Sequence, residues 1–215
     1  LDAGTQFLFD GGVNFNIYGT LKAIGTESDS IIFDNYGDER WRGFTLENAS
    51  DQTTFEYVRI SGAEKDNGGG MYLYSSNPTL THVTISNNTA THGGGMYLEY
   101  SNPTLTHVTI SNNTAEGFGG GMYLYASSNP NLTHVTISDN TAGVFGGGMS
   151  LYSSNPTLTN VTISNNGPIS EDGNSRGGGM YLNNESSPTM TDVIISNNIA
   201  NDEGGGIYCQ NGSSP

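Results

Sequence analysis

Tyrosine is the side chain that could do most chemistry in this sequence, because it returns at fixed intervals. It stands at the second and fourth positions of a repeated Met-Tyr-Leu-Tyr motif. A tyrosine ring has a flat apolar face and a polar tip, so a row of rings could stack on sugars or contact a partner protein. Stacked rings could equally just stabilise a sheet, and that alternative stays open. The candidate contact residues are Tyr72, Tyr74, Tyr97, Tyr123, Tyr125, Tyr152, Tyr181 and Tyr208.

Three histidines could in principle share a metal ion. His82, His107 and His134 occupy the same place in a repeated Thr-His-Val-Thr motif. No carboxylate accompanies them nearby in the sequence, and stacking alone rarely closes a ligand shell. We therefore interpret them as polar bend residues and predict no metal site.

The variable segments before each Gly-Gly-Gly triplet are further candidates, because variable loops on a rigid frame usually carry specificity. The longest, residues 167–176, contains Glu171, Asp172 and Arg176. Its carboxylates could bind Ca²⁺, although the Asp-rich calcium motif is absent. We expect these residues to contact a ligand or partner and expect no obligatory cofactor.

A Thr-x-Thr pair also repeats, at spacings that resemble the ice-binding faces of some β-solenoids. Thr is a good strand residue in any case, and Asn131 interrupts the array. The pairs are Thr79 and Thr81, Thr104 and Thr106, Thr157 and Thr159, and Thr189 and Thr191.

A repeat of about 25 residues positions all these side chains. The unit GGGMYLYSSNPTLTHVTISNN begins at Gly68, and its Gly triplets follow at intervals of 25, 26, 27, 31 and 27 residues. Such a period is typical of a solenoid. Within one unit, residues 71–74, 79–81 and 83–85 alternate apolar and polar side chains and are bounded by turn formers, which predicts three short strands per coil.

Stacking the coils would align equivalent residues at the spacing of parallel strands, about 4.8 Å. Each coil then contributes Met, Leu, Leu, Val and Ile to the core. The Gly triplet is expected at a corner, where positive φ or close packing excludes a side chain. We predict a stacked asparagine ladder. Its members are Asn87, Asn112, Asn165 and Asn197, with Asp139 as the exception.

We expect the N-terminal third to belong to the same solenoid, with coils that match the repeat less closely. Phe55 to Ile60 aligns with Leu80 to Ile85, and Phe44 and Leu46 align with Met71 and Leu73. We predict one domain over residues 1–215, with degenerate coils in 1–67 and regular coils in 68–215, the last of them incomplete. The fold class is all-β, a right-handed, single-stranded parallel β-helix.

The GGGMY segment followed by an Ile-Ser-Asn-Asn turn resembles the repeats of chlamydial polymorphic outer-membrane proteins. It is also similar to repeats of large secreted bacterial β-helix proteins, whose initial coils the segment from Gly19 to Phe33 resembles. The resemblance implies a pectin-lyase-like fold and a secreted or surface-displayed adhesin or scaffold.

Enzymes of this fold, by the same resemblance, work on the outer face of one sheet with a carboxylate cluster and a base or a second acid. Glu47 and Glu99 share the tyrosine columns but should lie two coil rises, about 10 Å, apart. The repeated strands contain no Lys or Arg. We expect no catalytic residues, with a polysaccharide lyase or hydrolase as the alternative.

The acidic charge of the chain excludes some classes of binding partner. Six basic residues face 21 acidic ones, for a net charge of −15, which disfavours nucleic acid and anionic membranes. No apolar run is long enough to insert in a membrane. We expect an extracellular, bacterial adhesin stalk or filament scaffold that contacts surface glycans or proteins, or stacks end to end with itself. Polysaccharide binding through the Tyr face and ice binding through the Thr face are the alternatives.

Overall fold

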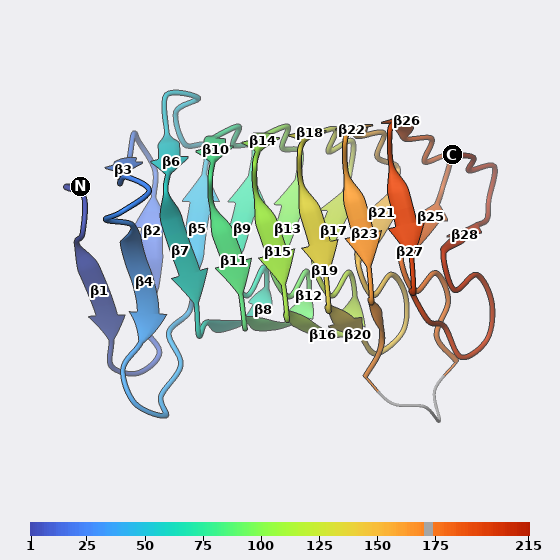
Figure 1. The fold of residues 1–215 in the computed structure, drawn as a ribbon, viewed down its shortest axis with the longest axis horizontal. Coiled ribbons are helices and arrows are strands. Elements are labelled where there is room, and N and C mark those ends of the chain that lie inside the picture. The colour runs from blue at the N-terminus through green and yellow to red at the C-terminus, as the bar shows by residue number, and fades with distance from the viewer. Residues whose placement is uncertain (170–173) are drawn as a thin grey trace.

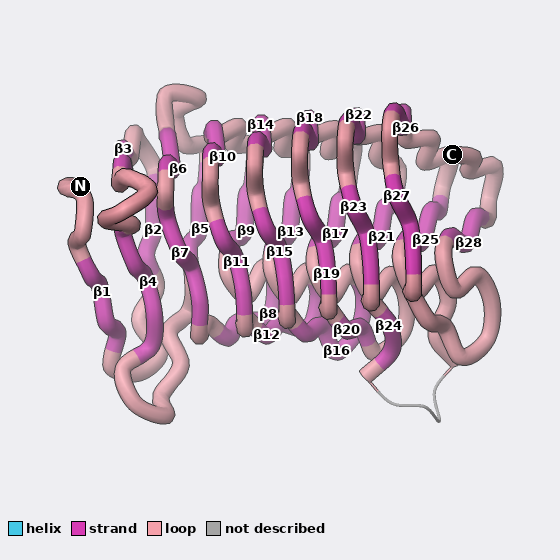
Figure 2. The backbone as a smooth tube through the Cα atoms, viewed as in Figure 1, coloured by secondary structure: helices cyan, strands magenta, loops and turns pink. Residues whose placement is uncertain are grey.

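The computed structural model describes residues 1–169 and 174–215, which form an elongated stack of coils (Figure 1). Strands joined by turns make up this part of the chain, as Figure 2 shows. Each strand pairs in parallel with the equivalent strand of the next coil, and the pairing builds four sheets that run along the stack.

Sheet 1 faces the viewer in Figure 1 and comprises β1 (Gln6–Phe9), β4 (Ile31–Asn35), β7 (Val58–Ser61), β11 (Thr84–Ser86), β15 (Thr109–Ser111), β19 (Thr136–Ser138), β23 (Thr162–Ser164) and β27 (Ile194–Ser196). Sheet 2 comprises β2 (Phe15–Ile17), β5 (Phe44–Glu47), β9 (Met71–Tyr74), β13 (Met96–Glu99), β17 (Met122–Tyr125), β21 (Met149–Tyr152), β25 (Met180–Asn183) and β28 (Ile207–Cys209).

Sheet 3 comprises β3 (Lys22–Ile24), β6 (Thr54–Glu56), β10 (Thr79–Thr81), β14 (Thr104–Thr106), β18 (Asn131–Thr133), β22 (Thr157–Thr159) and β26 (Thr189–Thr191). Sheet 4 comprises β8 (Glu64–Asn67), β12 (Thr89–His92), β16 (Thr114–Phe118), β20 (Thr141–Ala142) and β24 (Gly167–Pro168). Three strands per coil were predicted correctly. The short strands of sheet 4 are additional, and they occupy much of what the sequence indicated as variable loop.

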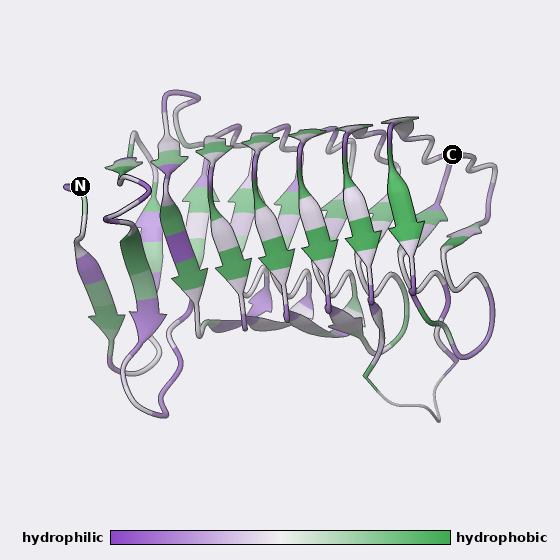
Figure 3. Ribbon diagram, viewed as in Figure 1, coloured by the Kyte–Doolittle hydropathy of each residue, from purple (hydrophilic) through white to green (hydrophobic). Residues whose placement is uncertain are grey.

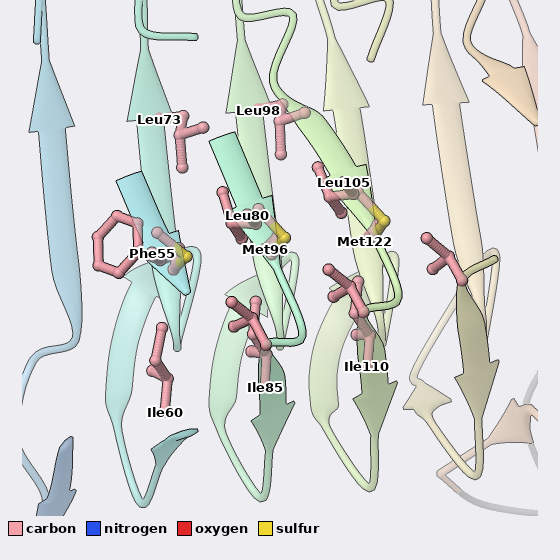
Figure 4. Packing of buried hydrophobic residues seen from close by; sticks show 14 of the residues in the cluster. Phe55, Ile60, Leu73, Leu80, Ile85, Met96, Leu98, Leu105, Ile110 and Met122 are labelled. Carbon is pink, nitrogen blue, oxygen red and sulfur yellow. The ribbon is translucent and has the colours of Figure 1, made fainter. Parts of the chain in front are cut away.

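The core is a set of apolar columns in register along the stack. Met71 pairs with Met96, and Ile85 pairs with Ile110. Figure 4 shows Met96, Ile85 and Ile110 in the core together with leucines of the same coils. The apolar bands of Figure 3 repeat at the same height on successive strands. The predicted alignment of Phe44 with Met71 is confirmed, so the N-terminal coils join the same core.

The asparagine ladder lies one residue later than predicted. Asn87 and its equivalents are exposed corner residues with φ of 54–57°. This left-handed turn redirects the chain, so the following asparagine points inward. Nδ2 of each inward asparagine donates to Oδ1 of the next at 2.9–3.1 Å. The ladder consists of Asn88, Asn113, Asn140, Asn166 and Asn198.

A second buried ladder joins the coils at the opposite side of sheet 2. The backbone N–H of Ser76 donates to Oγ of Ser101 at 3.0 Å, and Ser101 donates likewise to Ser128 at 3.1 Å. The serine hydroxyls donate to backbone carbonyls of their own turns. Both ladders satisfy buried backbone groups at corners that strand pairing leaves open.

The Gly triplet fits the corner for two reasons. Gly93 has φ +64°, which a residue with a side chain rarely adopts. A Cβ on Gly94 would lie 2.5 Å from the carbonyl oxygens of Gly120 and Thr114. The corner therefore excludes side chains at these positions, as the sequence predicted.

Candidate functional site

The outer face of sheet 2 holds the predicted tyrosine columns, and a row of side chains beside sheet 4 partly covers it. The residues just before each Gly triplet bridge from coil to coil, as Phe118 does to Phe145. The two rings stack 5.5 Å apart. Phe145 also stacks on Tyr181 at 4.3 Å, and Phe118 lies 5.9 Å from Tyr123. The sequence placed these phenylalanines in loops and gave no sign that they would fold over the tyrosines.

This cover buries part of the first tyrosine column. Tyr97 and Tyr123 are each 8% exposed and Tyr181 is 4% exposed. Burial raises the pKa of all three hydroxyls. These rings therefore act mainly as packing along the stack. The tyrosines that keep more surface are Tyr72, Tyr74, Tyr125, Tyr152 and Tyr208.

A charged groove of about 560 Å³ lies beside the N-terminal part of this face, where sheet 4 begins. Lys65 is one of its lining residues and donates to Oγ1 of Thr45. Its ammonium also lies 5.3 Å from the centre of the Tyr72 ring. Burial, and then the nearby positive charge of Arg42, lower the pKa of Lys65 to about 8. Sequence reasoning missed this lysine because it lies outside the three expected strands.

The two glutamates of this face are placed as predicted. Glu47 and Glu99 both pair with Tyr74, from opposite sides, so one coil separates them. The Tyr72 hydroxyl donates to Oε2 of Glu99 at 2.8 Å. Burial first, and then this contact with Glu99, raise the pKa of Tyr72. The Glu99 carboxylate is therefore held by Tyr72 of the same chain, whereas Glu47 is exposed.

A smaller pocket, of about 170 Å³, lies further along the same face. It opens where Ser150 takes the place of a tyrosine between Tyr123 and Tyr181. Aromatic rings wall it, and Tyr152, which is 37% exposed, also lines it. The register of the repeats shows Ser150 as the exception in its column, but not that a pocket would result.

The histidines stack as expected. The rings of His82, His107 and His134 follow each other at 4.9 Å and are within 3° of parallel. Each has φ of 52–53°, so each occupies a left-handed bend. Within residues 1–169 and 174–215, no group of three or more His, Cys, Asp or Glu could hold a metal ion.

The candidate loop residues are only partly covered by the structure. Glu171 and Asp172 lie outside the described residues. Arg176 contacts Asp202 at 2.8 Å and Glu203 at 3.5 Å and lies 5.3 Å from the centre of the Tyr208 ring. This arginine therefore ties neighbouring coils together.

The predicted Thr array runs along sheet 3. Thr79 pairs with Thr104, and Thr104 pairs with Asn131, which interrupts the array as the sequence indicated. Ice binding through it stays a prediction.

A family model for the right-handed beta helix region matches residues 42–215. The chain belongs to this right-handed beta-helix family. The match agrees with the parallel coils, and the family includes both enzymes and proteins without catalytic activity. Comparison with curated proteins and with solved structures gave no match. In the described part of this family member, no helix is long and apolar enough to cross a membrane.

Proposed function

We propose that this beta helix is an extracellular structural or adhesive rod, either the stalk of a cell-surface adhesin or a filament-forming scaffold. One observation carries the proposal: the repeated polar residues are engaged in contacts between coils. The amides of Asn113 bond to both neighbouring coils, and the serine ladder does the same at another corner. Side chains committed to stacking stiffen a rod and leave few groups for chemistry.

Stacking with another copy would take place at the coil that contains β27. Val193 and Ile195 pack against the core but are only partly buried, and the strand edge of β27 faces away from β23. Open sheet edges template further pairing. A coil of a second copy would cover these side chains and extend the core, giving a filament by head-to-tail contact.

The experiment compares two lysine substitutions on neighbouring residues of β27. Ile195→Lys puts a charge on the core face that a docking coil would cover, whereas Ile194→Lys adds the same charge on the outer face, where Ile194 is 59% exposed. We expect sedimentation velocity and negative-stain microscopy to show rods that lengthen with concentration for the parent and for Ile194→Lys, and short rods for Ile195→Lys. Short monodisperse rods for the parent at all concentrations would refute self-stacking.

A second candidate function is contact with acidic polysaccharides. It rests on Lys65 beside the Tyr72 ring and not on the groove as a whole, whose lining has five carboxylates and three cationic side chains. A cation beside an aromatic ring suits a uronate sugar, since Lys65 could pair with the carboxylate while Tyr72 packs on the ring. With a pKa of about 8, Lys65 loses its charge as pH rises through that value. Retention on a uronate polysaccharide should therefore fall between pH 7 and 9 and be weaker in Lys65→Met than in the exposed-site control Lys22→Met. Retention that changes neither with pH nor on Lys65→Met would exclude binding at Lys65.

Turnover of such a polysaccharide would extend this candidate to catalysis. On this face, Glu99 would be the candidate acid or base, and Tyr72 is its hydrogen-bond partner. A screen of neutral and acidic polysaccharides, with Glu99→Gln as the variant, tests it. Product formation lost in that variant would support an enzyme, and equal product formation would exclude Glu99.

A further inference from the structure

Ser150 breaks the most regular feature of sheet 2. In register, its column reads Tyr72, Tyr97, Tyr123, Ser150, Tyr181 and Tyr208. One ring is missing from a row of rings, and the row does not close over the gap. The pocket of about 170 Å³ is the space that remains.

Rings from three successive coils line this gap: the coil before Ser150, its own coil and the coil after it. Phe118 and Tyr123 come from the coil before, Phe145 comes from the coil of Ser150 itself, and Tyr181 comes from the coil after. Phe145 is held in place because it stacks on Tyr181 at 4.3 Å and 6° and also on Phe118 at 5.5 Å and 5°. The slot, as we call this pocket, is therefore lined by aromatic groups that already have partners.

The size of the slot suits one six-membered ring, because a cavity of about 150 Å³ in a protein core is enough to take up benzene. The polar groups available to it are few. Ser150 is 2% exposed, and its hydroxyl has no hydrogen-bond partner among the residues that the structure describes. Asn183 also lines the pocket, with its side-chain oxygen already accepting from Asn211 at 2.7 Å.

We propose that this pocket binds a phenolic ring, the group that its own column lacks. A phenol would place its faces against the aromatic walls and offer one hydroxyl to Ser150 or Asn183. A pyranose of similar size would carry several hydroxyls into a slot of ring faces, where most would lose water without gaining a partner. The phenol belongs either to a small aromatic molecule or to a tyrosine side chain of a partner protein.

The test uses the whole chain and four probes: phenol, benzene, N-acetyltyrosinamide and methyl glucoside. Binding is measured by saturation-transfer NMR and by titration of the aromatic proton shifts. We expect saturable binding of phenol, with contacts from its protons to the rings of Phe118 and Phe145. Similar binding of N-acetyltyrosinamide identifies a tyrosine side chain as the ligand, and binding of phenol alone identifies a small molecule.

Two variants of one residue supply the controls. Ser150→Tyr restores the missing ring, so it should weaken phenol binding by more than about tenfold, the loss of roughly one ring's stacking. Ser150→Ala keeps the space but removes one hydroxyl partner, so its preference for phenol over benzene should be smaller than that of the parent. The proton contacts in the parent chain test the site even if Ser150→Tyr fails to fold. Absence of saturable phenol binding, equal binding by Ser150→Tyr, or a preference for methyl glucoside would overturn the proposal.

Discussion

Replacing Asn113 by alanine tests whether the inner asparagine ladder stabilises the stack. The Asn113 side chain is fully buried and makes four hydrogen bonds. Its Nδ2 donates to the Ile85 carbonyl and to Oδ1 of Asn140, both at 3.0 Å. Its Oδ1 accepts from the backbone N–H and from Nδ2 of Asn88, both at 3.1 Å.

The expected loss follows from these contacts. Each buried hydrogen bond contributes about 1 kcal/mol net, so removing four should lower the free energy of unfolding by about 4 kcal/mol. The backbone N–H of Asn88 is left buried without its acceptor, and this cost keeps the expected loss from being smaller. Such a change is a large fraction of the stability of a typical domain, about 5–15 kcal/mol.

Guanidinium unfolding followed by far-UV circular dichroism measures this, with the midpoint and the slope both reported. The matched control is the preceding residue, Asn112→Gly, because Asn112 has φ 55° and is exposed. Glycine adopts that conformation readily, so this variant should change stability by less than about 0.5 kcal/mol. If Asn113→Ala cost no more than Asn112→Gly, the ladder would not hold the coils together.

Three further changes probe the corner, the groove and the tyrosines. Gly94→Ala should lower the free energy of unfolding by about 2–3 kcal/mol, because its Cβ would lie 2.5 Å from a backbone oxygen of the next coil. The control Gly19→Ala has open space around the new Cβ and should change the free energy of unfolding little. Equal losses in the two variants would contradict this packing. The folded chain releases the Lys65 proton near pH 8 and the unfolded chain near 10.5, so parent stability should rise between these values relative to Lys65→Met, by about 1–2 kcal/mol after screening. A constant difference would mean that Lys65 is not desolvated. Burial raises the pKa of Tyr97, so the folded state keeps a proton that the unfolded state loses above pH 10. The denaturant midpoint of unfolding should therefore fall between pH 10 and 11, and it should fall less steeply in Tyr97→Phe. An unchanged midpoint in the parent would refute this.

The core could be predicted from the sequence because it depends on period and residue type. Met71, Leu73 and Ile85 repeat with nearly constant spacing, and stacking is the arrangement that buries them all. The ladder was misplaced by one residue because Asn87 and Asn88 are the same residue type. The left-handed backbone at Asn87 decides which of them points inward. The signal in the sequence was the pair Asp139-Asn140, because only the second position of the pair is Asn in every regular coil.

The candidate site was harder to predict because its parts come from segments that do not follow the repeat. Phe118 and Phe145 cover the tyrosines from positions that the sequence gave to loops. Lys65 lies in β8, whose sequence Glu-Lys-Asp-Asn is polar throughout and lacks the alternation that indicates a strand. These contacts depend on how neighbouring coils meet, which periodicity within one coil does not encode.

The in-register columns have a consequence for how such a chain can change over generations. Loss of residues 93–118 would join His92 to Gly119 and bring Met71 opposite Met122, and Asn88 opposite Asn140. Each new pair repeats a pair of residue types that the stack already contains. Exchange between similar repeats would therefore shorten or lengthen the molecule by whole coils while its cross-section stays the same. The length of the rod can therefore change in steps of one coil, while the surface that each coil presents stays the same.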